Sequence, residues 1–322
     1  MQGKMLLGRS AKQEVYVGVD VCKEWLDVYL HPIGLKMRVA NTPEGIKRLK
    51  RWLADHTIAL VVMEATAKFH RVAQRMLHAA GLCVAVINPL RSRLFAEALG
   101  QLAKTDPIDA RMLALLGESL SPKAVPPVPE LVEALHEIVR ARQEATDELT
   151  AFKNRHSAST VAFVKREIAR AIKGLESHIE RLGIEAARRI EANPALAHRY
   201  RILMSIPGIG PVTASILLVG MTELGTLTGK AAALLTGLAP IAWDSGEKDG
   251  KRHIRGGRGY VRNALYMAAR AAARCVPHLK AFYERLVATK SDKVAITAVM
   301  RKLIVLANTL IKEDRTWQPV RP

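Results

Sequence analysis

The chain has 322 residues, which is enough for about two domains of ordinary size. Hydrophobic residues make up 49% of it and charged residues 25%, a balance that excludes a mainly disordered chain and a multi-span membrane protein. Lys and Arg number 49 against 30 Asp and Glu, and the resulting net charge of +19 indicates an anionic partner. Nucleic acid is the first expectation and an acidic membrane surface the second.

The three cysteines have no CxxC spacing, so the sequence indicates neither a disulfide framework nor a zinc site. A reducing cytoplasm fits this pattern. The apolar stretch near the N-terminus is too short for a secretory signal, and no export is expected.

The first part of the chain predicts an α/β domain. Three strand-like runs joined by short links come first, which predicts hairpins: 15–21, 24–30 and 36–41. Two continuous apolar runs of buried-strand type then alternate with helical patterns: 58–65 and 82–89. Hairpin strands followed by alternating helices and strands predict a mixed sheet covered by helices. We place this domain at residues 1–120.

The rest of the chain predicts mainly helices. Four prolines between 121 and 130 are typical of a linker. A long charged segment with apolar residues every three or four positions follows to about residue 192, which predicts an antiparallel helical hairpin or coiled coil of the kind that dimerises. The expected organisation is therefore a linker and helical arm at 121–194 and a mainly helical domain at 195–322.

Four acids occupy positions suited to chemistry in the first domain. Asp20 lies in the first strand, Glu64 lies at the end of an apolar strand, and Asp106 and Asp109 are three residues apart on one helix face. A carboxylate inside a strand or at its end is costly to bury without a partner. Four such groups converging on one point would suit a hard divalent cation such as Mg²⁺, which prefers oxygen ligands and bridges phosphates.

Each of these acids also has a structural interpretation. Asp106 before Pro107, with Asp109 in the first turn, is typical of a capped helix. Asp20 is also consistent with a bulge or a strand edge, and Glu64 with an ion pair to Lys68.

Two further segments indicate contact with nucleic acid. The turn Ile206-Pro-Gly-Ile-Gly-Pro resembles a helix-hairpin-helix loop, in which Gly208 and Gly210 would expose backbone N–H groups to a phosphate. Six basic residues against one Asp then form a Gly-rich loop that predicts a phosphate-backbone surface: Lys248, Lys251, Arg252, Arg255, Arg258 and Arg262. An ordinary helix-start turn and a solvated loop are the alternatives. Ser245, just ahead of the loop, would by itself be a turn residue.

The motifs together resemble those of a known family. VGVDVCKEWLDV, MEATAKFH, VINP, KTDPIDA, IPGIGPVTA, LTGLAP, DSG and HIRGGRGYVRNALYMAA follow in the order seen in the DEDD transposases of the IS110 family of bacterial insertion sequences. The resemblance covers nearly the whole chain. It implies a RuvC-like, RNase H-like N-terminal domain whose four acids are Asp20, Glu64, Asp106 and Asp109, and a C-terminal transposase domain whose catalytic serine is Ser245.

The same resemblance implies the partners. It implies target and donor DNA, a noncoding bridge RNA as guide, Mg²⁺ at the acids, a homo-oligomer (dimer or tetramer), and a cytoplasmic protein associated with the nucleoid when active. A covalent phosphoserine conserves the energy of the broken bond, as recombination requires. Two alternatives remain: a RuvC-like hydrolytic endonuclease in which Ser245 is only a turn residue, and a non-catalytic nucleic-acid-binding protein.

Overall fold

The computed structural model describes residues 13–101, 106–242, 244, 250 and 252–319. The chain divides into two compact units, residues 1–128 and 129–322. Each unit has its own hydrophobic core.

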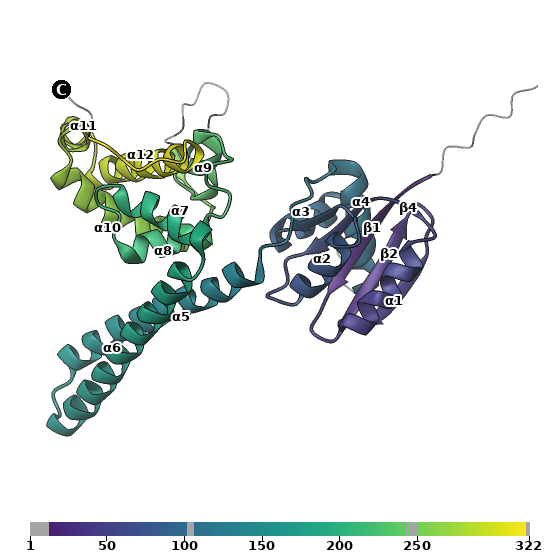
Figure 1. Ribbon diagram of the computed structural model, residues 1–322, viewed down its shortest axis with the longest axis horizontal. Coiled ribbons are helices and arrows are strands. Elements are labelled where there is room, and N and C mark those ends of the chain that lie inside the picture. Colours follow the sequence, from purple (N-terminus) through teal and green to yellow (C-terminus); the bar gives the residue numbers. More distant parts are fainter. Residues whose placement is uncertain (1–12, 102–105, 243, 245–249, 251, 320–322) are drawn as a thin grey trace, which may run out of the picture. The chain divides into compact units, whose positions relative to one another are not determined.

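The first unit is built on a five-stranded sheet in the order β3-β2-β1-β4-β5 (Figure 1). The strands are β1 (Glu14–Val21), β2 (Trp25–His31), β3 (Lys36–Ala40), β4 (Thr57–Glu64) and β5 (Val84–Ile87). The first three strands pair antiparallel as hairpins, whereas β1, β4 and β5 run parallel. The predicted hairpins, the mixed sheet and the α/β class of this unit are therefore confirmed.

Helices cover both faces of this sheet. The helices are α1 (Pro43–Leu53), α2 (His70–His78), α3 (Pro89–Ala98) and α4 (Asp106–Leu120). The odd-numbered residues of β1, such as Val17 and Val19, pack with α1 and α2 on one face. On the other face, Val62 of β4 packs with Leu113 and Leu116 of α4.

Gly18 allows α4 to lie directly on β1. A Cβ at Gly18 would stand 1.9 Å from the Ala110 carbonyl oxygen and 2.5 Å from the Ala114 backbone nitrogen, so only glycine fits there. Further along α4, Gly117 lies against Tyr16 and Val62. The helix therefore runs antiparallel to β1 and begins near the carboxyl ends of β1 and β4.

The second unit is almost entirely helical. Its helices are α5 (Glu130–Ala158), α6 (Ala162–Glu191), α7 (Pro194–Ser205), α8 (Pro211–Gly220), α9 (Gly229–Leu235), α10 (Gly259–Cys275), α11 (Pro277–Val287) and α12 (Asp292–Lys312). The long helices α5 and α6 pack against each other as the predicted helical hairpin. The Pro-rich stretch 121–129 is not helical, as expected of a linker. A short hairpin of β6 (Pro240–Ile241) and β7 (His253–Ile254) was not predicted.

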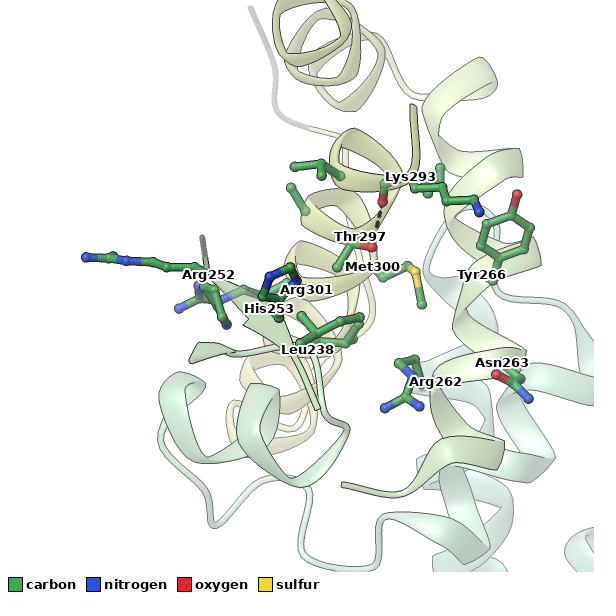
Figure 2. Close-up of a pocket in the computed structure, with 15 residues that line it drawn as sticks. Leu238, Arg252, His253, Arg262, Asn263, Tyr266, Lys293, Thr297, Met300 and Arg301 are labelled. Carbon is green, nitrogen blue, oxygen red and sulfur yellow. Dashed lines mark hydrogen bonds between the residues drawn. The ribbon is translucent and has the colours of Figure 1, made fainter. Parts of the chain in front are cut away.

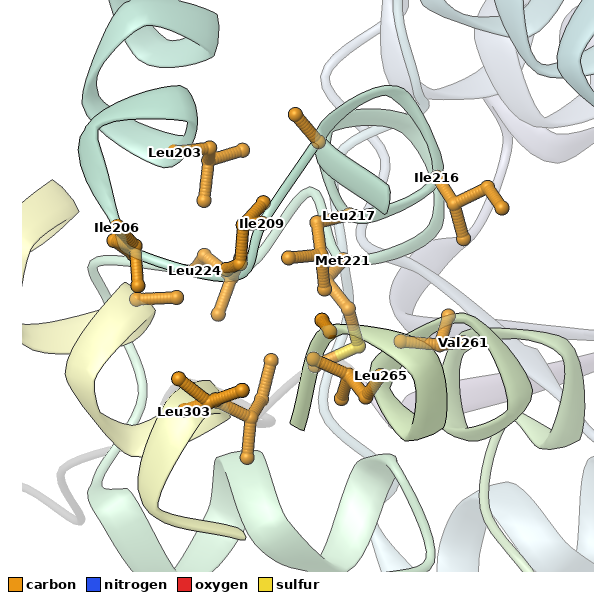
Figure 3. Packing of buried hydrophobic residues seen from close by; sticks show 14 of the residues in the cluster. Leu203, Ile206, Ile209, Ile216, Leu217, Met221, Leu224, Val261, Leu265 and Leu303 are labelled. Carbon is orange, nitrogen blue, oxygen red and sulfur yellow. The ribbon is translucent and has the colours of Figure 1, made fainter. Parts of the chain in front are cut away.

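The core of the second unit joins α7, α8, α10 and α12 (Figure 3). Leu217 of α8 and Leu265 of α10 are fully buried, as is Leu303 of α12. By length and composition α12 is apolar enough to cross a membrane, but 56% of its apolar window is buried inside the unit. The packing identifies α12 as a core helix.

Candidate active site and nucleic-acid interface

Asp20 and Glu64 lie side by side at one edge of the sheet. The parallel pairing of β1 and β4 joins Val17 to Val61 and Val19 to Met63, and the next residue on each strand is Asp20 and Glu64. Both are half-buried on the face that α4 covers. The register therefore brings together two acids that are 44 positions apart in the sequence.

The first turn of α4 begins at the same edge. The helix starts at Asp106 itself, and Asp109, which is half-buried, lies one residue before the Ala110 carbonyl that contacts Gly18. The side chain of Asp106 lies outside the described part of the chain. Two strand ends and one helix start thus bring Asp20, Glu64 and Asp109 to the same side of the first unit, where the backbone of Asp106 also begins α4.

Ser92 of α3 holds the Glu64 carboxylate. Its hydroxyl oxygen lies 2.5 Å from Glu64 Oε2 and 2.9 Å from the Pro89 carbonyl oxygen. Asn88 positions the helix, because its side chain accepts a hydrogen bond from the Leu90 backbone N–H. Ser92 was not among the predicted site residues, since no pattern in a single sequence distinguishes it from other helix serines.

A neighbouring acid is neutralised within the sheet. Asp27 lies directly opposite Asp20 in the antiparallel pairing of β1 and β2. Arg38 of β3 binds Asp27 with two hydrogen bonds of 2.8 and 2.7 Å. Because opposed like charges destabilise a sheet, this pairing lowers the negative charge beside Asp20.

The structure weighs against two of the structural alternatives for these acids. The register shift in β1 lies between Val15 and Tyr16, whereas Asp20 is regularly paired, so Asp20 does not mark a bulge. Glu64 accepts a hydrogen bond from the Ser92 hydroxyl, and among the described residues no ion pair joins Glu64 to Lys68.

The acids supply only oxygen donors, which fits a hard divalent cation. Among the side chains that the structure describes, a set that leaves out Asp106, no three His, Cys, Asp or Glu lie close enough together to hold a metal.

In the second unit, Gly208 has a packing role. Its φ is +93°, and a Cβ there would lie 2.4 Å from the Ala268 carbonyl oxygen of α10. Gly210 has open space around it and precedes α8, which has no side-chain cap. Contact of either glycine with a phosphate stays a prediction.

The predicted basic loop, residues 248–262, includes β7, and its last four residues belong to α10, so Arg262 lies on that helix and not in a loop. Ser245, Lys248 and Lys251 are outside the described residues. Asp244 accepts a hydrogen bond from the Gly250 backbone N–H at 3.1 Å, which ties together the two ends of the segment that contains Ser245. Beyond it, Arg252 and Arg255 are exposed to solvent, as a phosphate-binding surface requires.

Two predicted binding arginines have partners within the chain. Arg258 pairs with Glu223 through both of its terminal nitrogens, and its Nη1 also donates to the Gly220 carbonyl at 2.7 Å. Arg262 is half-buried and donates to the Gly256 carbonyl at 2.9 Å. The sequence reveals the charge of Arg258 but not its pairing, because Glu223 is 35 residues away.

Comparisons with known proteins agree with the motifs. A family model for DEDD transposases of the IS110 type matches residues 17–160, and a model of the IS116/IS110/IS902 transposase family matches residues 200–284. The pilin gene-inverting protein of Moraxella bovis is 28% identical over 94% of this chain and 98% of its own, and that of Moraxella lacunata is 27% identical over the same shares. An uncharacterized 43.6 kDa protein of the insertion element IS110 from Streptomyces coelicolor is 29% identical over 45% of this chain and 36% of its own.

These matches define a DNA transposase or recombinase. The chain belongs to the IS110 family of transposases. Membership implies DNA substrates and, in a DEDD transposase, the use of divalent metal ions.

Proposed function

We propose that this transposase cuts and rejoins DNA through a phosphoserine on Ser245, with Asp20, Glu64, Asp106 and Asp109 as the metal-binding acids, guided by a noncoding bridge RNA. The observation that carries the proposal is the register of β1 and β4, which places Asp20 and Glu64 together beside the start of α4. A purely structural role gives no reason for two half-buried acids from separate strands to lie side by side at this edge.

The fold supports a RuvC-like, RNase H-like assignment for the first unit. β1 is the central strand, and its carboxyl end lies between an antiparallel hairpin on one side and parallel β4 on the other. An acid near the end of this strand and another on its parallel neighbour share a single face. That arrangement suits a site open to a nucleic-acid backbone.

The acids are the expected ligands of Mg²⁺. A divalent cation, when bound, polarises the scissile phosphate and stabilises the charge that develops on it. Asp20 and Glu64 would hold it from the strands, and Asp106 and Asp109 from the helix start. Ser92 keeps the Glu64 carboxylate in one orientation through its 2.5 Å contact.

Ser245 is the proposed nucleophile. Its hydroxyl oxygen forms a bond to phosphorus, the serine proton leaves, and the 3′ oxygen of the cut strand departs as a hydroxyl. The 3′ hydroxyl of another strand then attacks the phosphoserine, which restores the phosphodiester and releases the serine. Asp244, the neighbouring acid, accepts a hydrogen bond from the Gly250 N–H through Oδ1 at 3.1 Å.

The remaining partners follow from the charge and the helical arm. A net charge of +19 favours binding of both DNA and a bridge RNA. The packed pair α5 and α6 offers the surface for a homo-oligomer, a dimer or tetramer. A cytoplasmic, nucleoid-associated enzyme is the setting we infer.

The acids are tested by cleavage of labelled element-end DNA with Mg²⁺ and RNA, resolved on denaturing gels. Asp20→Asn and Glu64→Gln should abolish cleavage and leave RNA binding intact. Asp55→Asn is the matched control, because Asp55 is an exposed acid that precedes the opposite, amino end of β4. Cleavage by both site variants at the parental rate would refute the assignment of the acids.

The guide is tested separately, by sequencing RNA that copurifies with the chain from its native host. The proposal expects one discrete noncoding RNA encoded beside the gene. A random sample of cellular RNA would count against RNA guidance while leaving the chemistry of the acids unaffected.

A further inference from the structure

A cavity of about 640 Å³ lies in the second unit between the β6–β7 hairpin, α10 and α12 (Figure 2). Four basic side chains line it: Arg252 beside β7, Arg262 on α10, and Lys293 and Arg301 on α12. No Asp or Glu is among the described residues of its wall. Only Arg252 and Arg262 belong to the basic set that the sequence predicted.

The charge of this cavity is not neutralised within the described structure. Arg252, Lys293 and Arg301 have no ion pair with any described residue. Asp292, the acid next to Lys293, is occupied by Arg270 at 3.2 Å and by the Tyr283 hydroxyl. The cavity therefore presents a positive surface to an incoming anion.

The cavity also has an aromatic and apolar component. Three residues of its wall are exposed: Tyr266 by 39%, Val294 by 49% and Ile254 by 38%. Figure 2 shows Tyr266 and Lys293 on one side and Arg252 and Arg301 on the other. Exposed aromatic rings beside cations are the features that hold unpaired nucleotides, because a base stacks on the ring while its phosphates contact the cations.

The dimensions favour an unpaired strand. A volume of about 640 Å³ falls in the range of sites that bind small ligands, roughly 300–1,000 Å³, and suits one or two nucleotides. A base within a duplex has its ring faces covered by its neighbours, so stacking on Tyr266 requires the base to leave the helix.

We propose that this cavity binds an unpaired nucleotide segment, with a base on Tyr266 and phosphates on Lys293 and Arg301. The inference rests on the proposed nucleic-acid function and adds binding residues on α10 and α12. An opened DNA strand and an unpaired stretch of the guide RNA share this chemistry.

The test measures binding of short oligonucleotides to the full chain by fluorescence anisotropy, in EDTA so that no strand is cleaved. The probes are an unpaired deoxyribonucleotide 10-mer, the ribonucleotide of the same sequence, and a DNA duplex of the same length. Lys293→Gln/Arg301→Gln removes two charges from the cavity. The control variant, Lys290→Gln/Lys312→Gln, removes two exposed charges that do not line the cavity. Lys290 lies two residues before α12, and Lys312 is the last residue of that helix.

The proposal expects the cavity double variant to weaken binding of at least one unpaired probe about tenfold more than the control variant. The probe with the larger loss identifies the strand as DNA or RNA. Tyr266→Leu should lose about fivefold or more from stacking, and Tyr266→Phe should retain parental affinity.

Equal losses in the cavity and control variants, or a loss confined to the duplex probe, would overturn the proposal. A circular dichroism spectrum and melting temperature matching the parent show that each variant is folded. Since the assay needs no cleavage, its outcome is independent of whether Ser245 forms an adduct.

Discussion

Arg258 and Glu223 form a half-buried ion pair that joins the start of α10 to the segment after α8. Arg258 Nη1 lies 2.8 Å from Glu223 Oε2, and the same nitrogen binds the Gly220 carbonyl at 2.7 Å. Burial raises the pKa of the Glu223 carboxyl, but the hydrogen bonds and charge attraction of Arg258, together with weaker hydrogen bonds from the Glu223 backbone and Thr222, outweigh that effect and hold the pKa below the ordinary value of 4.5. We conclude that Arg258 stabilises the fold rather than belonging to a free phosphate-binding surface.

Glu223→Gln should therefore lower the free energy of unfolding of the second unit by about 1–2 kcal/mol at pH 7. This lies between the small contribution of an exposed ion pair and the larger cost of breaking a fully buried one. Because the folded pKa of Glu223 is depressed, its contribution is present above about pH 4.5 and is lost as the pH falls through the folded pKa. Thermal melts of parent and variant between pH 7 and pH 3 measure this. The difference between them should shrink toward acid pH, and a constant difference would contradict the role given to the pair.

The salt dependence of DNA binding tests the basic loop. Replacing Lys251, Arg252 and Arg255 by Gln should flatten the log-log slope of affinity against salt by roughly 0.7–0.9 for each phosphate that the loop no longer neutralises. Lys47, Arg48 and Arg51 on α1 provide the control, because they are exposed cations on the sheet face opposite the acids. An unchanged slope in the loop variant would remove this loop from backbone binding. Adding Arg258→Gln should lower the melting temperature.

Ser92 is a positioning residue for Glu64. Ser92→Ala should slow DNA cleavage roughly tenfold, because the carboxylate loses its hydrogen-bond donor. The Mg²⁺ concentration for half-maximal cleavage should rise as well, which general destabilisation would not cause. Ser92→Thr keeps the hydroxyl and should restore both values. Ser159→Ala removes a hydroxyl from the end of α5 and serves as control. An unchanged Mg²⁺ dependence in Ser92→Ala would contradict a positioning role of Ser92 for Glu64.

Asp106→Asn separates the two interpretations of the start of α4. Asn caps a helix about as well as Asp, so a capping role predicts an unchanged melting temperature and full cleavage. A metal-binding role predicts the same melting temperature with cleavage abolished, because an amide is a much poorer ligand for Mg²⁺ than a carboxylate. Differential scanning calorimetry and the cleavage assay on one preparation distinguish these outcomes. Full activity in the Asn variant would return Asp106 to a structural role.

The sequence predicted most of the first unit because its signals are local. The short strand-like runs with their brief links and the Pro-rich stretch after residue 120 depend on neighbouring residues. The close approach of α4 to Gly18 was not predicted, because it depends on residues far along the chain.

Contacts between distant residues were out of reach. Nothing in the sequence indicates that Ser92 meets Glu64, that Glu223 occupies Arg258, or that Lys293 and Arg301 face the basic loop across a cavity. The strand register brings Asp20 and Glu64 to one edge of the sheet, and the convergence of all four acids stays a prediction from the motif resemblance. The three-part division at residues 120 and 194 stays a prediction.

The most direct test of the account is the covalent species on Ser245. Labelled target DNA, bridge RNA and Mg²⁺ are incubated with the parent chain and resolved by denaturing electrophoresis. The account predicts a shifted, protease-sensitive band that is absent from Ser245→Ala, while Ser245→Ala still binds RNA and DNA. Ser245→Cys should retain at most a trace of the band, since a thiol is the nearest replacement in shape and reactivity. A band that persists in Ser245→Ala would place the nucleophile elsewhere, and cleavage to free ends without a band in the parent would contradict the phosphoserine mechanism.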